Sequence, residues 1–115
     1  MTLLSKSSIL SVNDLQHEDV SVPAWGGTVR VRAMTGQERD EFRLALSQEG
    51  PTPVGQFAAA LLVATIVDES GNRLFSADDM AALQQKSAAS LDGPSSVAMR
   101  LNGLGGRAIE EAKND

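Results

Sequence analysis

FAAALLVATIV, residues 57–67, is the stretch that decides the fold of this 115-residue chain. It is apolar all round rather than along one stripe, and a helix of that kind must be covered on every face. We therefore expect a helix over residues 54–67 whose apolar faces are covered by the rest of the chain or by another chain. The run has about half of the ~20 residues that a membrane-spanning helix needs, so we expect no membrane partner.

Upstream of this helix, residues 19–34 predict a β-hairpin. Two segments with alternating valines, 20–22 and 29–33, flank the turn sequence PAWGG. Segments of period two on either side of a glycine-rich turn are typical of a hairpin. Because an isolated hairpin is marginally stable in water, its valine face is expected to pack on the helices that follow.

The remaining helices are predicted from their start signals. Residues 35–38, TGQE, form a capping box and open a helix over 36–47. Ser76, followed by two aspartates, opens another over 77–87, and Pro94 suits the first turn of a helix over 94–103. A short helix is expected over 107–113, after glycines that end the preceding helix.

These elements predict an α+β fold, mostly α, in which the N-terminal hairpin packs on a bundle of about four short helices. Residues 1–16 are rich in serine and lack a sustained period, so we expect a flexible N-terminal arm. Residues 17–115 are expected to form a single globular domain, since a chain of this length fits one core.

Composition removes several classes of function. The formal net charge is −5 and no basic stripe is present, so a nucleic-acid partner is not expected. The chain has no cysteine, which excludes disulfides and thiolate chemistry. The first ten residues lack the long apolar core of a secretory signal, so we expect a cytoplasmic protein.

The pattern of reactive residues predicts no catalytic, metal or cofactor site, and hence no enzyme. His17 is the only histidine, and no convergent partners for it are apparent. The acidic turn 68–72 differs from a calcium loop, because Arg73 stands where the loop requires glycine and Asp79 where it requires glutamate. No serine has a candidate base beside it.

Two features are candidates for binding another protein. The apolar helix is either the central core helix or a helix with one face left for a partner or for self-association. Trp25 at the hairpin tip is either an exposed binding residue or folded back on the hairpin. The candidate partner-binding residues are Trp25, Phe57, Leu61, Leu62 and Ile66.

Three segments resemble a known family. They are VSVPAWGGTVRVRAMTGQERDEF (20–42), VDESGNRLFSADDMAAL (67–83) and LNGLGGRAIEEAKND (101–115). In their order and character they are similar to the tail assembly chaperones of bacteriophages with long, flexible tails.

The resemblance implies a non-enzymatic phage or prophage protein that acts in virion assembly in the host bacterial cytoplasm. Such a protein would bind the tape measure protein, keep it soluble, help recruit tail tube subunits, and be absent from the mature virion. A structural virion component, such as a head-tail connector or a minor tail protein, is the alternative from a different class.

Overall fold

The fold is mostly helical, with one antiparallel sheet built on the N-terminal hairpin, which confirms the predicted class. A computed structural model describes residues 2–46 and 52–104. In chain order its elements are α1 (Lys6–Ser11), β1 (His17–Val22), the 3-10 turn η1 (Pro23–Trp25), β2 (Gly27–Arg32), α2 (Gly36–Ala45), α3 (Val54–Thr65), β3 (Ile66–Val67), the 3-10 turn η2 (Ala77–Asp79), α4 (Met80–Gln84) and α5 (Ala88–Leu101).

The predicted hairpin is formed by β1 and β2, in a register that sets Val20 opposite Val29. Gly26 closes the turn with a φ of 77°, a left-handed conformation that costs glycine little. Its N–H donates to the carbonyl of Pro23 over 3.0 Å. This compact turn holds Trp25 at the end of the hairpin.

A third strand, β3, was not predicted. The helix expected over 54–67 ends at Thr65, and Ile66 and Val67 instead pair with Val31 and Arg30 of β2. Both residues are β-branched, which disfavours a helix and suits a strand, and the pairing also satisfies backbone groups. The chain thus passes from the central helix directly into the edge of the sheet.

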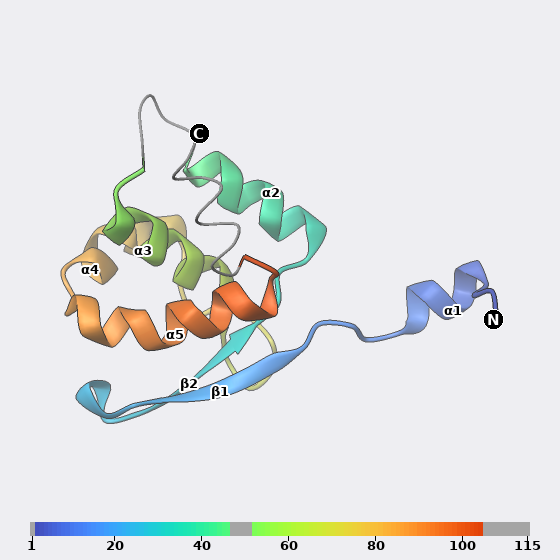
Figure 1. Cartoon of the computed structure of the whole chain (residues 1–115), viewed down its shortest axis with the longest axis horizontal. Helices are drawn as coiled ribbons and strands as arrows, with labels where there is room; N and C mark the ends of the chain where they lie inside the picture. Colours follow the sequence, from blue (N-terminus) through green and yellow to red (C-terminus); the bar gives the residue numbers. More distant parts are fainter. Residues whose placement is uncertain (1, 47–51, 105–115) are drawn as a thin grey trace.

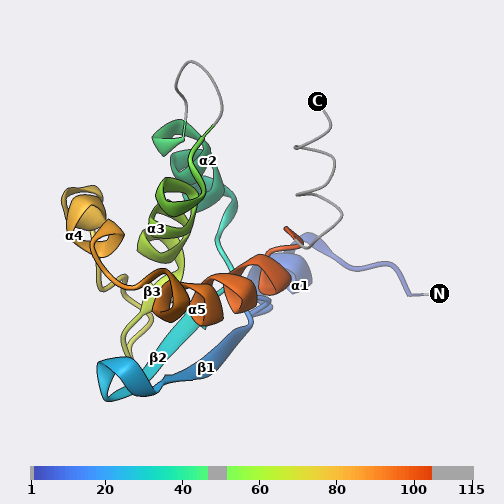
Figure 2. The same cartoon turned by 60° about the vertical axis from the view of Figure 1, so that its left-hand side comes forward.

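Helix α3 lies at the centre of the fold, with α2, α4 and α5 around it and the sheet below (Figures 1 and 2). All residues from Ala58 to Thr65 are buried. Thr65 is compatible with this core because its hydroxyl donates to the Leu61 carbonyl over 2.7 Å. The structure therefore agrees with the first interpretation of the apolar helix, in which it is the central helix of the core.

Helix α5 begins at Ala88, six residues before the predicted start at Pro94. The prediction was wrong because it took the proline as the first turn, whereas Pro94 lies inside the helix with its side chain fully buried. Burial of the ring offsets part of the cost of its missing N–H. The early start lets the helix lie across both β1 and β2, as Figure 2 shows.

The other boundaries differ less. The helix predicted over 77–87 is divided into η2 and α4 and ends at Gln84, and α2 ends at Ala45. Gly103, with a φ of 69°, ends α5 as predicted, while the helix expected over 107–113 lies outside the described residues. The expected N-terminal arm contains the short helix α1, which projects away from the other elements (Figure 1).

Candidate functional site

An apolar groove lies beside Trp25 at the end of the hairpin. Its volume is about 420 Å³, and its walls come from η1, Phe75, η2 and α4. The lining residues are Ala24, Trp25, Phe75, Asp79, Ala82, Leu83 and Lys86. A mostly apolar lining with one charge of each sign suits an apolar side chain of another protein.

The groove is fixed to the core through its aromatic and leucine side chains. Trp25 is partly buried against the main core cluster, and Phe75 packs against both core clusters. Leu83 is 5% exposed and belongs to the second cluster. Trp25 is thus folded back on its own domain and still presents part of its surface to the groove.

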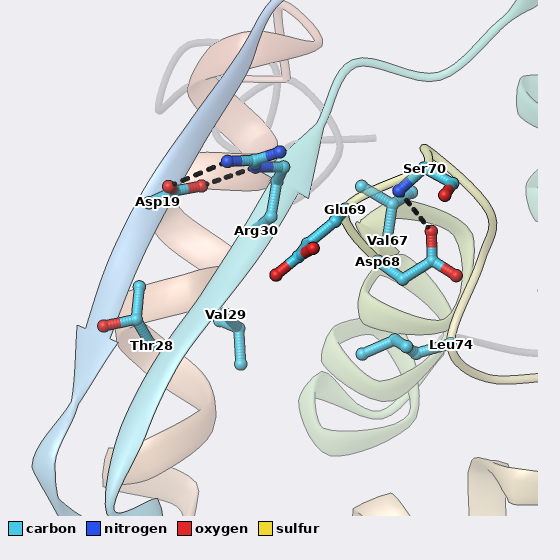
Figure 3. A pocket seen from close by; sticks show the side chains of 9 residues that line it. All are labelled: Asp19, Thr28, Val29, Arg30, Val67, Asp68, Glu69, Ser70 and Leu74. Carbon is cyan, nitrogen blue, oxygen red and sulfur yellow. Dashed lines mark hydrogen bonds and ion pairs between the residues drawn. The ribbon is translucent and has the colours of Figure 1, made fainter.

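A second cavity, of about 630 Å³, lies between the hairpin strands and the loop that carries Leu74 (Figure 3). It is bounded by the strands of the sheet and by the loop that follows β3, and its lining residues are Asp19, Thr28, Val29, Arg30, Val67, Asp68, Glu69, Ser70 and Leu74. Because Leu74 and Phe75 are consecutive residues, the two cavities are neighbours along one side of the molecule.

An ion pair between the strands bounds this second cavity. Arg30 donates to both carboxylate oxygens of Asp19, over 2.8 and 3.2 Å. These hydrogen bonds, more than any other influence, hold the pKa of Asp19 below its ordinary value, and they raise the pKa of Arg30. The two charges satisfy each other, so this pair contributes no net charge to the cavity.

The acidic turn after β3 is held by hydrogen bonds between one of its own side chains and its backbone. Asp68 Oδ1 accepts hydrogen bonds from the N–H groups of Ser70 and Asn72, over 2.8 and 3.0 Å. Such bonds are those of a side-chain-stabilised turn. Within residues 2–46 and 52–104, no cluster of three or more His, Asp or Glu side chains could hold a metal ion.

Arg32 ties this loop to the hairpin and to α2. Its Nη1 donates to the Gly71 carbonyl over 2.9 Å, while its Nη2 lies 2.8 Å from both carboxylate oxygens of Glu38. Glu38 also accepts from the N–H of Thr35, which completes the predicted capping box. The helix cap and the position of the loop therefore depend on the same carboxylate.

The five predicted partner-binding residues do not form one site. Leu61 and Leu62 of α3 and Ile66 of β3 are 0% exposed, because the neighbouring helices and the sheet cover this part of the chain. Phe57 packs edge-to-face on Phe42, with ring centroids 5.6 Å apart, and lines neither of the two cavities. In this conformation only Trp25 of the five belongs to a groove that a partner can enter.

The sequence pattern did not identify Phe75 and Leu83 as partners of Trp25. The available signal was the apolar pair Leu74–Phe75 directly before the Ser76 helix start, since large apolar residues next to a cap commonly pack against the helix they precede.

In the described part of the chain, no helix is both long and apolar enough to cross a membrane.

Comparison with solved structures found a protein of similar architecture. It matches with a TM-score of 0.54 and 17% sequence identity, over 82% of this chain and 85% of its own. That protein is the tail assembly chaperone of bacteriophage HK97. No protein-family model and no curated protein matches the sequence.

The match extends over more than four fifths of both chains, so the likeness concerns the fold rather than one motif. At this level of identity it establishes a shared fold. It also agrees with the resemblance found in the three sequence segments around the hairpin, the acidic turn and the end of α5.

Proposed function

We propose that this chain is a phage tail assembly chaperone: a non-enzymatic protein that binds the tape measure protein, keeps it soluble and helps recruit tail tube subunits. The observation that carries the proposal is the shared fold with the HK97 tail assembly chaperone across more than four fifths of each chain. The resemblance of the three sequence segments leads to the same family.

The groove beside Trp25 supports the proposal by offering a place for a client. A long client rich in apolar residues exposes side chains that aggregate unless they are covered. The groove is apolar at its floor, and aromatic residues in partly buried pockets dominate binding energies at protein interfaces. We propose that Trp25 and Phe75 together cover an apolar side chain of the tape measure protein.

Phe57 and the three buried candidate residues enter this proposal differently. Phe57 keeps partial exposure at the beginning of α3 and is a second candidate contact. Leu61, Leu62 and Ile66 are reached only if one of the covering helices moves, so their part in binding requires a conformational change in the chaperone.

Co-expression tests the proposed function. The tape measure protein of the same genome is expressed alone, with this chain, and with this chain carrying Trp25→Ala. We expect the client to be soluble with the unaltered chain and to aggregate in the other two cultures. A client that aggregates equally in all three would overturn the proposal.

Purified virions provide the second measurement. A chaperone acts in the host bacterial cytoplasm before the particle is complete, so mass spectrometry should not detect this chain in mature particles. Detection in a fixed ratio to the other tail proteins would instead favour a structural role, such as a head-tail connector or a minor tail protein.

A further inference from the structure

The second strand of the sheet is paired on both sides along only part of its length. β1 pairs with all of β2, but β3 pairs only with Arg30 and Val31. In the described part of the chain, residues 27–29 of β2 therefore have a strand neighbour on one side only. A strand edge of this kind is a template for another extended segment.

The cavity of about 630 Å³ lies directly beside this free edge. Thr28 and Val29 form one wall, and the loop from Asp68 to Leu74 forms the other. The loop begins where β3 would have to continue in order to pair with Val29, so the space between them is the position of the absent strand. Figure 3 shows this gap between β2 and the loop, with the carboxylate of Glu69 extending toward β2.

The charges around the gap are unbalanced. The lining side chains include three carboxylates and one guanidinium, and that guanidinium is engaged by Asp19. Glu69 contributes to the raised pKa of Arg30 through its charge, but neither it nor Asp68 has a cation within ion-pair distance among the described residues. The gap is therefore acidic on its loop side.

Apolar side chains line the gap as well. Val29 is partly buried on the face of the sheet that carries Val20 and Val31, and Leu74 is 54% exposed. Alternate residues of a strand point to opposite faces. A segment paired with this edge thus lies beside the apolar side chains of Val29 and Leu74 and beside the carboxylates of the loop, and its alternate side chains point to opposite faces of the sheet.

We propose that the free edge of β2 at residues 27–29 binds an extended segment of a partner protein in which apolar and basic side chains alternate. The segment adds a strand to the sheet beyond the end of β3, and its basic side chains neutralise Glu69 and Asp68. This site is separate from the Trp25 groove and does not depend on the proposed chaperone function. The two are neighbours across Leu74–Phe75, so one partner can occupy both.

The test uses the whole chain labelled with ¹⁵N and a synthetic peptide of alternating valine and lysine, about eight residues long, which exceeds the usual strand length slightly. We expect the peptide to shift the amide signals of Thr28 and Val29. It should slow hydrogen exchange at Thr28, because successive N–H groups of a strand point to opposite sides and the odd-numbered residues, such as Ala33, donate toward the β1 side. A peptide of alternating valine and glutamate is the matched probe. Its affinity should be lower by a factor of at least about ten.

Variants separate local charge from net charge. Glu69→Lys should weaken binding of the valine–lysine peptide by about threefold or more, because it reverses a charge beside the edge. Asp40→Lys makes the same change in net charge on the exposed side of α2, away from the gap, and should leave the affinity nearly unchanged. Both positions are exposed, so neither variant is expected to disturb folding.

Four outcomes would overturn the proposal. Hydrogen exchange at Thr28 is unaffected by the peptide. Signals shift only at Trp25 and Phe75, which places the peptide in the apolar groove. The two charge variants weaken binding equally. Hydrogen exchange at the edge is already slow before peptide is added and becomes slower as the protein concentration rises. This result would mean that a second copy of the chain binds the edge.

Discussion

Arg32 and Glu38 form the most enclosed ion pair among the described residues, with side chains 17% and 15% exposed. The two residues connect three parts of the fold. Arg32 lies at the end of β2, Glu38 in the first turn of α2, and the guanidinium also holds the loop carbonyl of Gly71. Because residues of this loop line the cavity of about 630 Å³, the pair holds one wall of that cavity in place.

Glu38→Gln tests this relationship. Glutamine still completes a capping box, so the substitution removes the charge and keeps the cap. We expect the free energy of unfolding to fall by about 2 kcal/mol, the usual cost when a charged hydrogen-bond partner of an enclosed group is lost. Denaturation by urea gives this value.

Glu41→Gln is the matched control for that variant. Glu41 is 46% exposed and pairs with Arg73 over 3.2 Å. A pair exposed to this degree contributes at most about 1 kcal/mol. Equal destabilisation by the two substitutions would mean that the Arg32–Glu38 pair has no special role.

Asn102 makes a connection of a different kind, between the end of α5 and the chain before α2. Its side chain accepts from the N–H of Met34 over 2.7 Å and donates to the Ala98 carbonyl over 2.8 Å, and the residue is 7% exposed. Asn102→Ala leaves a buried N–H without a partner. We expect a loss of about 1–3 kcal/mol.

The control for this variant is Asn13→Ala. Asn13 is exposed, and its side chain accepts only a local hydrogen bond from the N–H of Leu15. Its replacement should change stability by less than about 0.5 kcal/mol. If Asn102→Ala and Asn13→Ala have the same free energy of unfolding, the buried amide has no structural role.

The central helix predicts a steep contrast along its own length. Leu62 is 0% exposed and Val54 is 83% exposed. Leu62→Ala should cost about 2–5 kcal/mol, from lost burial and the cavity left behind. Val54→Ala should cost less than about 0.5 kcal/mol. Thermal unfolding of both variants measures the contrast, and similar values would contradict the covered position of α3.

The local patterns of the sequence predicted those elements whose signals are local. The valine alternation, the glycine turn and the TGQE box all lie within a few residues of the structure they specify, and each appears where expected. The fully apolar run predicted a covered helix, but its last two residues belong to a strand, because pairing with Val31 and Arg30 is a long-range contact that no local pattern contains.

The candidate site was predicted less completely for the same reason. Trp25 was identified from its chemistry, whereas Phe75 and Leu83 join it only through the packing of α4 against the hairpin end. The position of Pro94 was misjudged because a proline inside a helix is tolerated only when tertiary burial offsets its cost. The predicted limits of the arm and of the domain remain predictions.

The ion pair of Asp19 and Arg30 predicts a dependence on pH. The pKa of Asp19 in the folded chain lies below its ordinary value of 3.8, mainly because of the hydrogen bonds from Arg30. A lowered pKa favours the folded state when the carboxylate is ionised. This contribution is therefore present above pH ~4 and is lost as the pH falls through the folded-state pKa.

A titration of the Asp19 side-chain carbonyl by NMR measures this effect. Arg30→Gln should move the pKa of Asp19 upward, toward its ordinary value, because the main cause of the lowering is removed. Arg43→Gln removes an equal charge from α2 and should leave the pKa of Asp19 in place. A titration curve that Arg30→Gln does not shift would contradict the pairing.

Trp25→Ala is the variant that connects the groove with the proposed function. Trp25 is partly buried at the edge of the core. Removal of a fully buried aromatic side chain lowers the free energy of unfolding by about 3–5 kcal/mol, and Trp25→Ala should lower it by less. Removal of Trp25 should weaken binding of the tape measure protein by about thirtyfold or more, since a truncated hot-spot residue costs at least about 2 kcal/mol.

Leu44→Ala provides the comparison, because Leu44 is a large apolar residue that is 73% exposed on α2 and lines neither cavity. Isothermal titration of the purified client against both variants separates a specific contact from general loss of apolar surface. Circular dichroism confirms that each variant is folded at the temperature of the titration. If a folded Trp25→Ala protein binds the client as tightly as Leu44→Ala does, the client contacts another surface, and the groove beside Trp25 is not its binding site.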